Sequence, residues 1–133
     1  MVRDPVETCF SNLRELYSNI NRHSYDQLEL ADYFLQYRRL MAHWHAMFPG
    51  RILDVDYARL TADPEGTMRD VAAFCGIDFV EGMQSTATSS RAVLTASSIQ
   101  VRDEAVHREV PKWAPYATHL QPMIRALREE STR

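Results

Sequence analysis

Only one segment of this sequence has the composition of a β-strand, and helical patterns flank it on both sides. The run RILDVDY at residues 51–57 is short, rich in β-branched and aromatic side chains, and follows the helix stop Pro49-Gly50. One strand cannot satisfy its own backbone groups, so a helix–strand–helix order normally packs on a parallel sheet of several strands. We therefore expect an α/β, helix-rich fold with few parallel strands, in which residues 1–3 end a second strand.

Helical patterns with capping signals account for much of the remaining chain. Asp4-Pro5 and Asp63-Pro64 each place an N-cap before a proline at the first helical position, and Glu7 stands at the capping-box position. We predict helices over residues 5–19, 25–48, 64–75 and 116–130, and a loop-rich segment over 80–110. In the longest helix we expect these apolar residues to face the core: Leu30, Tyr33, Phe34, Tyr37, Leu40, Met41, Trp44 and Phe48.

Length and composition limit the class of protein. The 133 residues suffice for a single domain, residues 1–133, and leave no room for a second one. Cys9 and Cys75 lack C-x-x-C spacing, so we expect no metal site. The net charge of −3 argues against a nucleic-acid partner. We expect no membrane span and a cytoplasmic location, because no apolar run approaches the ~20 residues of a membrane span and the N-terminus is charged.

Arg3 and Ser11 form a candidate anion site around the start of the first helix. Arg3 lies where the expected strand ends, and Ser11 follows eight residues later, about two helical turns after the cap. A guanidinium fork, a hydroxyl and the exposed amides of a helix N-terminus all suit phosphate oxygens. On spacing alone, the alternative of a surface arginine beside a capped helix stays open.

Further segments around this pair stand in an order known from one enzyme family. Val2-Arg3-Asp4-Pro5 with Ser11, and then residues 51–79 with Tyr57, resemble the sulfotransferases, in particular their bacterial and tyrosylprotein types. The resemblance implies that Arg3 and Ser11 contact the 3′-phosphate of 3′-phosphoadenosine 5′-phosphosulfate (PAPS). It also implies that Tyr57 lies near the adenosine, although an aromatic that closes a strand onto the core explains Tyr57 as well.

Two later segments extend the resemblance to about residue 128. Residues 91–102 are similar to a segment in which a serine reaches the cofactor, and Ser97 is the first choice here, with Ser98 as the alternative. Lys112-Trp113 is similar to the basic residue and tryptophan near the family's C-terminus, where the basic residue faces a cofactor phosphate. Lys112 is the one lysine among the 15 basic residues, and we expect Trp113 to pack the last helix onto the core.

Two parts of the family's site have no counterpart in this sequence. Sulfotransferases open with a phosphate-binding loop such as P-x-S-G-T, whereas the glycines here are scattered at Gly50, Gly66, Gly76 and Gly82. The family's general base also precedes the arginine–serine pair, so the catalytic residue is unknown and enzymatic activity stays uncertain. We expect the chain to be the C-terminal part of a sulfotransferase domain, with a partial P-loop-NTPase-like three-layer fold.

The resemblance implies transfer of a sulfuryl group from PAPS to an acceptor hydroxyl on a protein tyrosine, a glycan or a small molecule. This chain would carry the half that binds the 3′-phosphate. The alternative is a non-catalytic helical remnant that binds the cofactor or a partner protein. A nucleotide kinase fragment would need a G-K-[ST] loop, which is absent. Strand edges left unpaired predict self-association.

Overall fold

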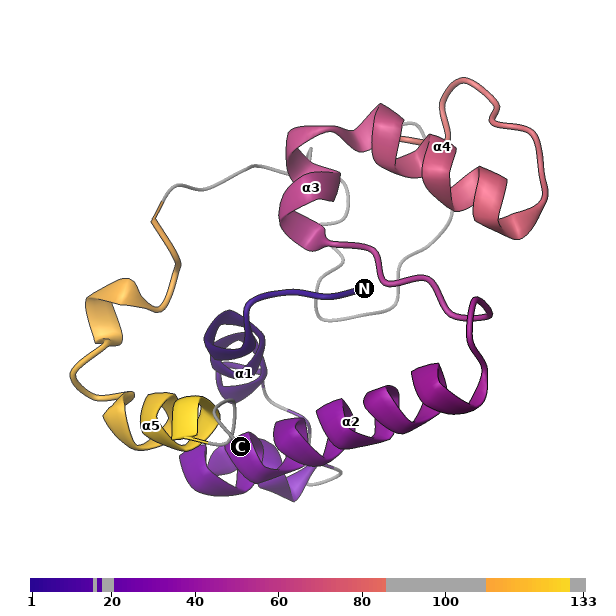
Figure 1. Cartoon of the computed structure of the whole chain (residues 1–133). Helices are drawn as coiled ribbons and strands as arrows, with labels where there is room; N and C mark the ends of the chain where they lie inside the picture. The colour runs from indigo at the N-terminus through magenta and orange to yellow at the C-terminus, as the bar shows by residue number, and fades with distance from the viewer. Residues whose placement is uncertain (16, 18–20, 86–109, 130–133) are drawn as a thin grey trace. The chain divides into compact units, whose positions relative to one another are not determined.

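The computed structural model describes residues 1–15, 17, 21–85 and 110–129, and its regular structure is almost entirely helical (Figure 1). The elements in chain order are α1 (Pro5–Leu13), η1 (Arg22–Tyr25), α2 (Gln27–Met47), α3 (Tyr57–Ala62), α4 (Pro64–Cys75), η2 (Ala114–Tyr116) and α5 (Gln121–Glu129). The chain divides into two compact units. Met1–Val2 with Leu53–Glu109 contains α3 and α4, and Arg3–Ile52 with Val110–Arg133 contains α1, α2 and α5.

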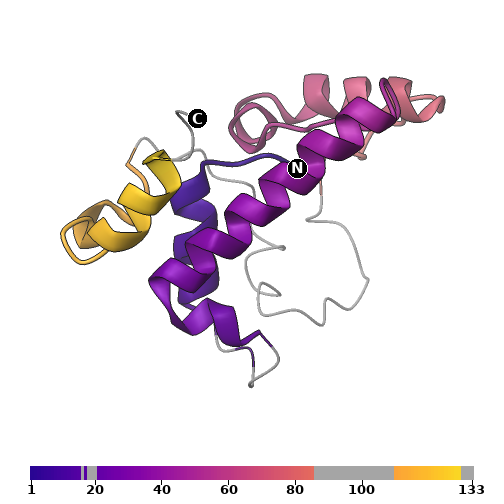
Figure 2. The same ribbon diagram turned by 60° about the horizontal axis from the view of Figure 1, so that its bottom comes forward.

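The α1–α2–α5 unit holds most of the buried apolar side chains. Asp4 caps α1 by accepting a hydrogen bond from the Glu7 amide at 2.8 Å, and Asp26 caps α2 through the amides of Leu28 and Glu29. Figures 1 and 2 both show α1 and α5 lying against the N-terminal half of α2. The core between these helices consists of Val6, Cys9, Phe10, Leu30, Ala31, Leu35, Leu120, Met123, Ile124 and Leu127.

The prediction that the whole apolar stripe of residues 25–48 faces the core is wrong. Leu30 is buried and Phe34 and Met41 are half-buried, but Tyr33, Tyr37, Leu40, Trp44 and Phe48 are exposed. Tyr33 lies between the buried Ala31 and Leu35 along the chain but points to another face of the helix, and for the residues after Leu35 the reason is the length of the partners. α1 and α5 have 9 residues each, about 14 Å, whereas α2 has 21, about 31 Å. Two short helices therefore cover only part of the long one.

The first and the last predicted helices have different bounds in the structure. α1 ends at Leu13, with Arg14 as its C-cap, rather than continuing toward residue 19. The last helix does not begin at Tyr116, because η2 and a turn over 117–120 precede α5. The four apolar residues expected on this helix, Leu120, Met123, Ile124 and Leu127, are nevertheless all buried.

The strand predicted over residues 51–57 is wrong. Among the described residues, β-pairing is limited to one isolated parallel bridge between Val2 and Asp56. The Val2 amide donates to the Val55 carbonyl at 2.7 Å, and the Tyr57 amide donates to the Val2 carbonyl at 2.8 Å. The Asp56 carboxylate then accepts from the amides of Ala58 and Arg59, which starts α3 at Tyr57. A helix cap therefore ends the extended run before a ladder can form.

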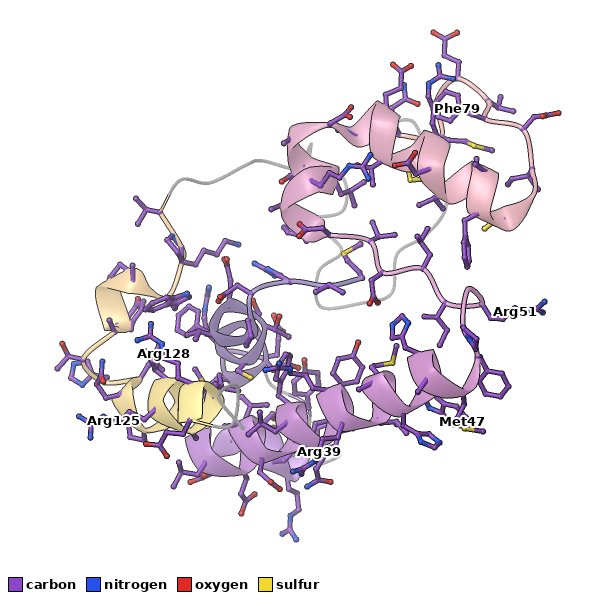
Figure 3. The ribbon with its side chains drawn as sticks, viewed as in Figure 1. Arg39, Met47, Arg51, Phe79, Arg125 and Arg128 are labelled. Carbon is purple, nitrogen blue, oxygen red and sulfur yellow. The ribbon has the colours of Figure 1, made fainter. Side chains whose placement is uncertain are left out.

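The α3–α4 unit is held largely by caps and by contacts at its surface. Asp63 caps α4 through the Gly66 amide at 2.9 Å, and Gly76 ends the helix in the left-handed conformation. Arg69 pairs with Glu65 at 2.6 Å and lies 4.2 Å from the centre of the Phe79 ring, which Figure 3 labels. In the described part of this unit, the buried side chains are Thr67 and Ala72.

None of the helices in the described part of the chain combines the length and the apolar character that a bilayer span requires.

Candidate functional site

Arg3 directly precedes the cap of α1. Asp4 has an extended backbone with φ −48° and ψ 129°, and Pro5 follows as the first helical residue. The Asp4 carboxylate accepts a hydrogen bond from the Glu7 amide, and the backbone carbonyl of Asp4 accepts one from the Thr8 amide at 2.9 Å. An anion at this helix end would therefore have to share the first turn with a carboxylate. The side chain of Arg3, rather than the exposed amides that we expected, is the main donor there.

Glu7 holds the guanidinium of Arg3. Its Oε1 lies 2.9 Å from Nη2 of Arg3, and the two side chains are only 29% and 20% exposed for Arg3 and Glu7. The sequence pattern assigned Glu7 to a capping box, so its role beside Arg3 was missed. The signal that could have found it is the i, i+4 spacing of opposite charges across the start of the helix. The pair orients the arginine along the face of α1 that carries Ser11.

Ser11 is half-buried in the last turn of α1, four residues after Glu7. Residues four apart lie on one face of a helix, so Glu7 stands between Arg3 and Ser11 along that face. The face thus presents a guanidinium, a carboxylate and a hydroxyl in succession. The guanidinium and the hydroxyl are groups that suit phosphate oxygens, against a cost from the negative charge of Glu7.

Lys112 belongs to the same compact unit as Arg3 and Ser11. It is half-buried in the turn before η2 and forms no ion pair within the described residues. Its neighbour Trp113 packs against the core to which α1 and α5 contribute, as predicted for this residue. The ring of Tyr116 in turn lies 5.4 Å from that of Phe10 in α1. These contacts anchor the Lys112 segment to the unit that carries the α1 face.

Tyr57 belongs to the α3–α4 unit, which is a different compact unit from the one that contains Arg3, Ser11 and Lys112. It is half-buried as the first residue of α3 and not the end of a strand. Its amide hydrogen-bonds Val2, the residue before Arg3 in the chain. Ser97 and its alternative Ser98 lie outside the described residues.

The four glycines all serve turns or caps. Gly50, Gly76 and Gly82 have positive φ, and Gly66 lies in the first turn of α4, where a Cβ would come within 2.1 Å of the Asp63 carboxylate. None of them begins a phosphate-binding turn between a strand and a helix. Among the described side chains, no group of three or more His, Cys, Asp or Glu residues could hold a metal ion.

Comparison with known proteins assigns the chain to a family. A sequence model of the sulfotransferase family matches residues 1–81, the span that contains Arg3, Ser11 and Tyr57. The chain therefore belongs to the sulfotransferase family.

One relative is an uncharacterized protein of Aquifex aeolicus (strain VF5), which is 39% identical over 93 residues. That alignment covers 70% of this chain and 12% of the relative, so the chain spans a small part of the relative's length. No solved structure matches the chain.

Proposed function

We propose that this chain supplies the 3′-phosphate-binding half of a PAPS-dependent sulfotransferase site. The observation that carries the proposal is the family match over residues 1–81 together with the α1 face, on which Glu7, one turn before Ser11, forms an ion pair with Arg3. The finer assignment within the family is the bacterial or tyrosylprotein type. The fold that goes with it is a P-loop-NTPase-like three-layer arrangement in which residues 1–133 form part of one domain.

Each proposed residue has a role that suits its chemistry. Arg3 and Ser11 bind the 3′-phosphate by charge-assisted hydrogen bonds. Tyr57 lies against the adenosine, and Ser97, or Ser98 in its place, reaches the phosphosulfate side. Lys112 supplies a compact positive charge to phosphate or sulfuryl oxygens on that side. These residues bind and orient the cosubstrate, and none of them is assigned as the general base.

The donors among the described residues suit a doubly charged phosphate, but the carboxylates near them do not. A guanidinium, a hydroxyl and an ammonium lie in one compact unit, and all three side chains are half-buried, where charge interactions are stronger than in water. Asp4 and Glu7 oppose them with two carboxylates. We therefore expect binding that depends strongly on Arg3, because its positive charge offsets part of the negative charge of these two carboxylates.

The reaction in this proposal is in-line transfer of the sulfuryl group to an acceptor hydroxyl. The acceptor oxygen bonds to sulfur while the bond between sulfur and the 5′-phosphate oxygen breaks, which leaves adenosine 3′,5′-bisphosphate and releases the hydroxyl proton to a base. Positioning and charge stabilisation supply most of the rate, as in phosphoryl transfer. Protein tyrosines, glycans and small molecules with hydroxyl groups are the acceptor classes to test.

The first experiment is a thermal-shift titration of the chain with adenosine 3′,5′-bisphosphate, beside AMP, which lacks the 3′-phosphate. At one hundred times its dissociation constant, a ligand adds about 2.7 kcal/mol to the free energy of unfolding. We expect stabilisation by the bisphosphate and not by AMP. Arg3→Ala should weaken binding about tenfold or more, because a hydrogen bond to a charged group contributes about 1.5–3 kcal/mol.

Arg125→Ala is the matched control, because Arg125 is exposed on α5 of the same unit and points outward in Figure 3. It should leave the bisphosphate shift unchanged. A cooperative melting transition with no bisphosphate shift, or equal loss in both variants, would contradict the proposal. If the bisphosphate binds but a radiolabelled transfer assay yields no product with any acceptor class, the chain binds the cosubstrate without transferring the group.

A further inference from the structure

The ion pair between Glu7 and Arg3 involves the guanidinium to which the proposed function assigns a phosphate. Oε1 of Glu7 lies 2.9 Å from Nη2 of Arg3, a distance typical of a charge-assisted hydrogen bond. The Glu7 side chain is 20% exposed and the Arg3 side chain 29%, so water screens this pair less than it screens an ion pair on the open surface. Glu7 therefore places a negative charge within the proposed anion site.

An ion pair in the other compact unit shows what stronger exposure looks like. The side chains of Arg69 and Glu65 are 57% and 56% exposed, well above the values for Arg3 and Glu7. Pairs of that kind contribute little, because water and salt screen both charges. The charges of the Arg3–Glu7 pair are better shielded from water, and so they act more strongly on an ion that approaches either side chain.

Glu7 also differs from Asp4, the other carboxylate at this end of α1. Asp4 is exposed, and its Oδ1 accepts a hydrogen bond from the Glu7 amide at 2.8 Å, so its charge is solvated and engaged in the helix cap. The Glu7 carboxylate instead meets Arg3 across one helical turn. Of the two carboxylates, Glu7 is the one in contact with the group proposed to bind the 3′-phosphate.

A phosphate that binds Arg3 is opposed by Glu7 whichever nitrogen it approaches. At the nitrogen that contacts Glu7, the phosphate has to displace the carboxylate. At another nitrogen of the same guanidinium, two negative charges share one cation and repel each other at a distance of a few ångströms. The contribution of Arg3 to phosphate binding is therefore reduced by the partner that Arg3 has within α1.

We propose that Glu7 is a built-in counter-charge that weakens binding of the 3′-phosphate and speeds release of adenosine 3′,5′-bisphosphate. The inference rests on the proposed function, because it assigns a role at that same site. Glu7 acts through its charge and through Arg3, so it tunes affinity and is not a catalytic residue. Cosubstrate and product carry the same 3′-phosphate, so Glu7 weakens the binding of both, and a product that dissociates quickly frees the site for the next turnover.

The test is calorimetric titration of the full 133-residue chain and of Glu7→Gln with adenosine 3′,5′-bisphosphate. Glutamine matches glutamate in shape and keeps a side-chain oxygen that can accept from Arg3, but it has no charge. Glu7→Gln should bind the bisphosphate about tenfold more tightly, because a partly buried unit charge beside the phosphate is removed. Stopped-flow measurements should show most of the gain as slower dissociation.

Two controls separate the position of Glu7 from its contribution to the net charge. Glu29→Gln makes the same change on an exposed residue in the first turn of α2, in the same unit, and should leave the affinity unchanged. AMP lacks the 3′-phosphate, so Glu7→Gln should not improve its binding. Circular dichroism melts establish that the variants fold, which we expect because the Asp4 cap uses the backbone amide of residue 7. Glu7→Ala is a second variant without the charge and should also bind more tightly than the wild type.

Tighter binding of the bisphosphate by Glu7→Gln, with no gain in either control, is the expected result. Unchanged or weaker binding by Glu7→Gln, or an equal gain for AMP or in Glu29→Gln, would overturn the proposal. If the wild type binds the bisphosphate, Arg3→Ala does not, and Glu7→Gln brings no gain, the proposed function is supported and only the role of Glu7 is wrong. If neither the wild type nor Glu7→Gln binds the bisphosphate, both proposals are wrong.

Discussion

The position of Cys9 in the core determines the pKa and the accessibility of its thiol. The side chain is 1% exposed, and burial raises its pKa to about 12, with a smaller contribution from the negative charge of Asp4. The thiol is therefore protonated and shielded at neutral pH. Cys75, in contrast, is exposed at the end of α4. The two cysteines differ in reactivity because of tertiary packing.

The raised pKa of Cys9 predicts a loss of stability in alkali. The folded value of about 12 lies above the ordinary 9.0, so the contribution is complete below pH 9 and is lost as the pH rises toward 12. Urea unfolding between pH 8 and 11 should show a midpoint that falls more steeply in the wild type than in Cys9→Ala. Cys75→Ala should retain the wild-type slope. Equal slopes in the wild type and Cys9→Ala would contradict the assignment.

Glu7, also at the scale of the residue, shows that one short sequence pattern can suit two different interactions. Its position three residues after Asp4 suits a capping box, and its position four residues after Arg3 suits an ion pair. The structure has the ion pair, at 2.9 Å. The Asp4 carboxylate still accepts from the Glu7 amide, so one of the two hydrogen bonds of a capping box forms beside the ion pair.

At the scale of the element, the end of α4 depends on one residue. Gly76 has φ +68°, and the amides of Gly76 and Ile77 donate to the carbonyls of Ala73 and Ala72, which closes the helix. Gly76→Ala should lower the free energy of unfolding by about 1–2 kcal/mol, the cost of a left-handed backbone with a Cβ. Gly76→Asn should cost less. Chemical denaturation measures both, and an unchanged midpoint for Gly76→Ala would show that the cap is not needed.

The helix α2 illustrates a second property of elements, which is length relative to neighbours. Its cap at Asp26 and its end near the Pro49-Gly50 stop follow from local signals. Its apolar side chains continue past the ends of α1 and α5 and also extend to a neighbouring face, so part of the predicted stripe is core and part is surface. Periodicity predicts the stripe but not which part of it another element covers.

At the scale of the whole molecule, burial is unevenly divided between the two units. Every buried apolar side chain described in the structure except Ala72 lies in the α1–α2–α5 unit. Since buried apolar area is the main source of stability, the two units should differ in their resistance to local opening.

Native-state hydrogen exchange tests this difference. Amides of α1, α5 and the first half of α2 should be protected to the level of global unfolding, and those of α3 and α4 should exchange faster. Leu127→Ala should lower stability by about 2–5 kcal/mol and reduce protection in α1, α2 and α5 together. Equal protection across all the helices would indicate that the chain opens as one cooperative unit.

The sequence predictions for the candidate site depend on local signals, and among these the structure confirms the Asp4-Pro5 cap. The Asp4-Pro5 cap, the spacing from Arg3 to Ser11, and the family resemblance at residues 51–79 are all properties of short stretches. Tyr57 is the exception. Its segment was expected to be a strand, but the Asp56 cap turned it into the start of α3. Strand formation depends on distant partners, and one bridge to Val2 did not suffice.

The sequence by itself determined where α1 and α4 begin and where α4 ends, because the capping aspartates, the first-turn prolines and Gly76 act on the amides and carbonyls of their own turn. It also determined the family, through residues 1–81. The tertiary structure alone decided that the ring of Tyr116 meets that of Phe10, and that much of the α2 stripe stays exposed. Those outcomes depend on which side chains from distant parts of the chain meet, and no local pattern encodes such distances.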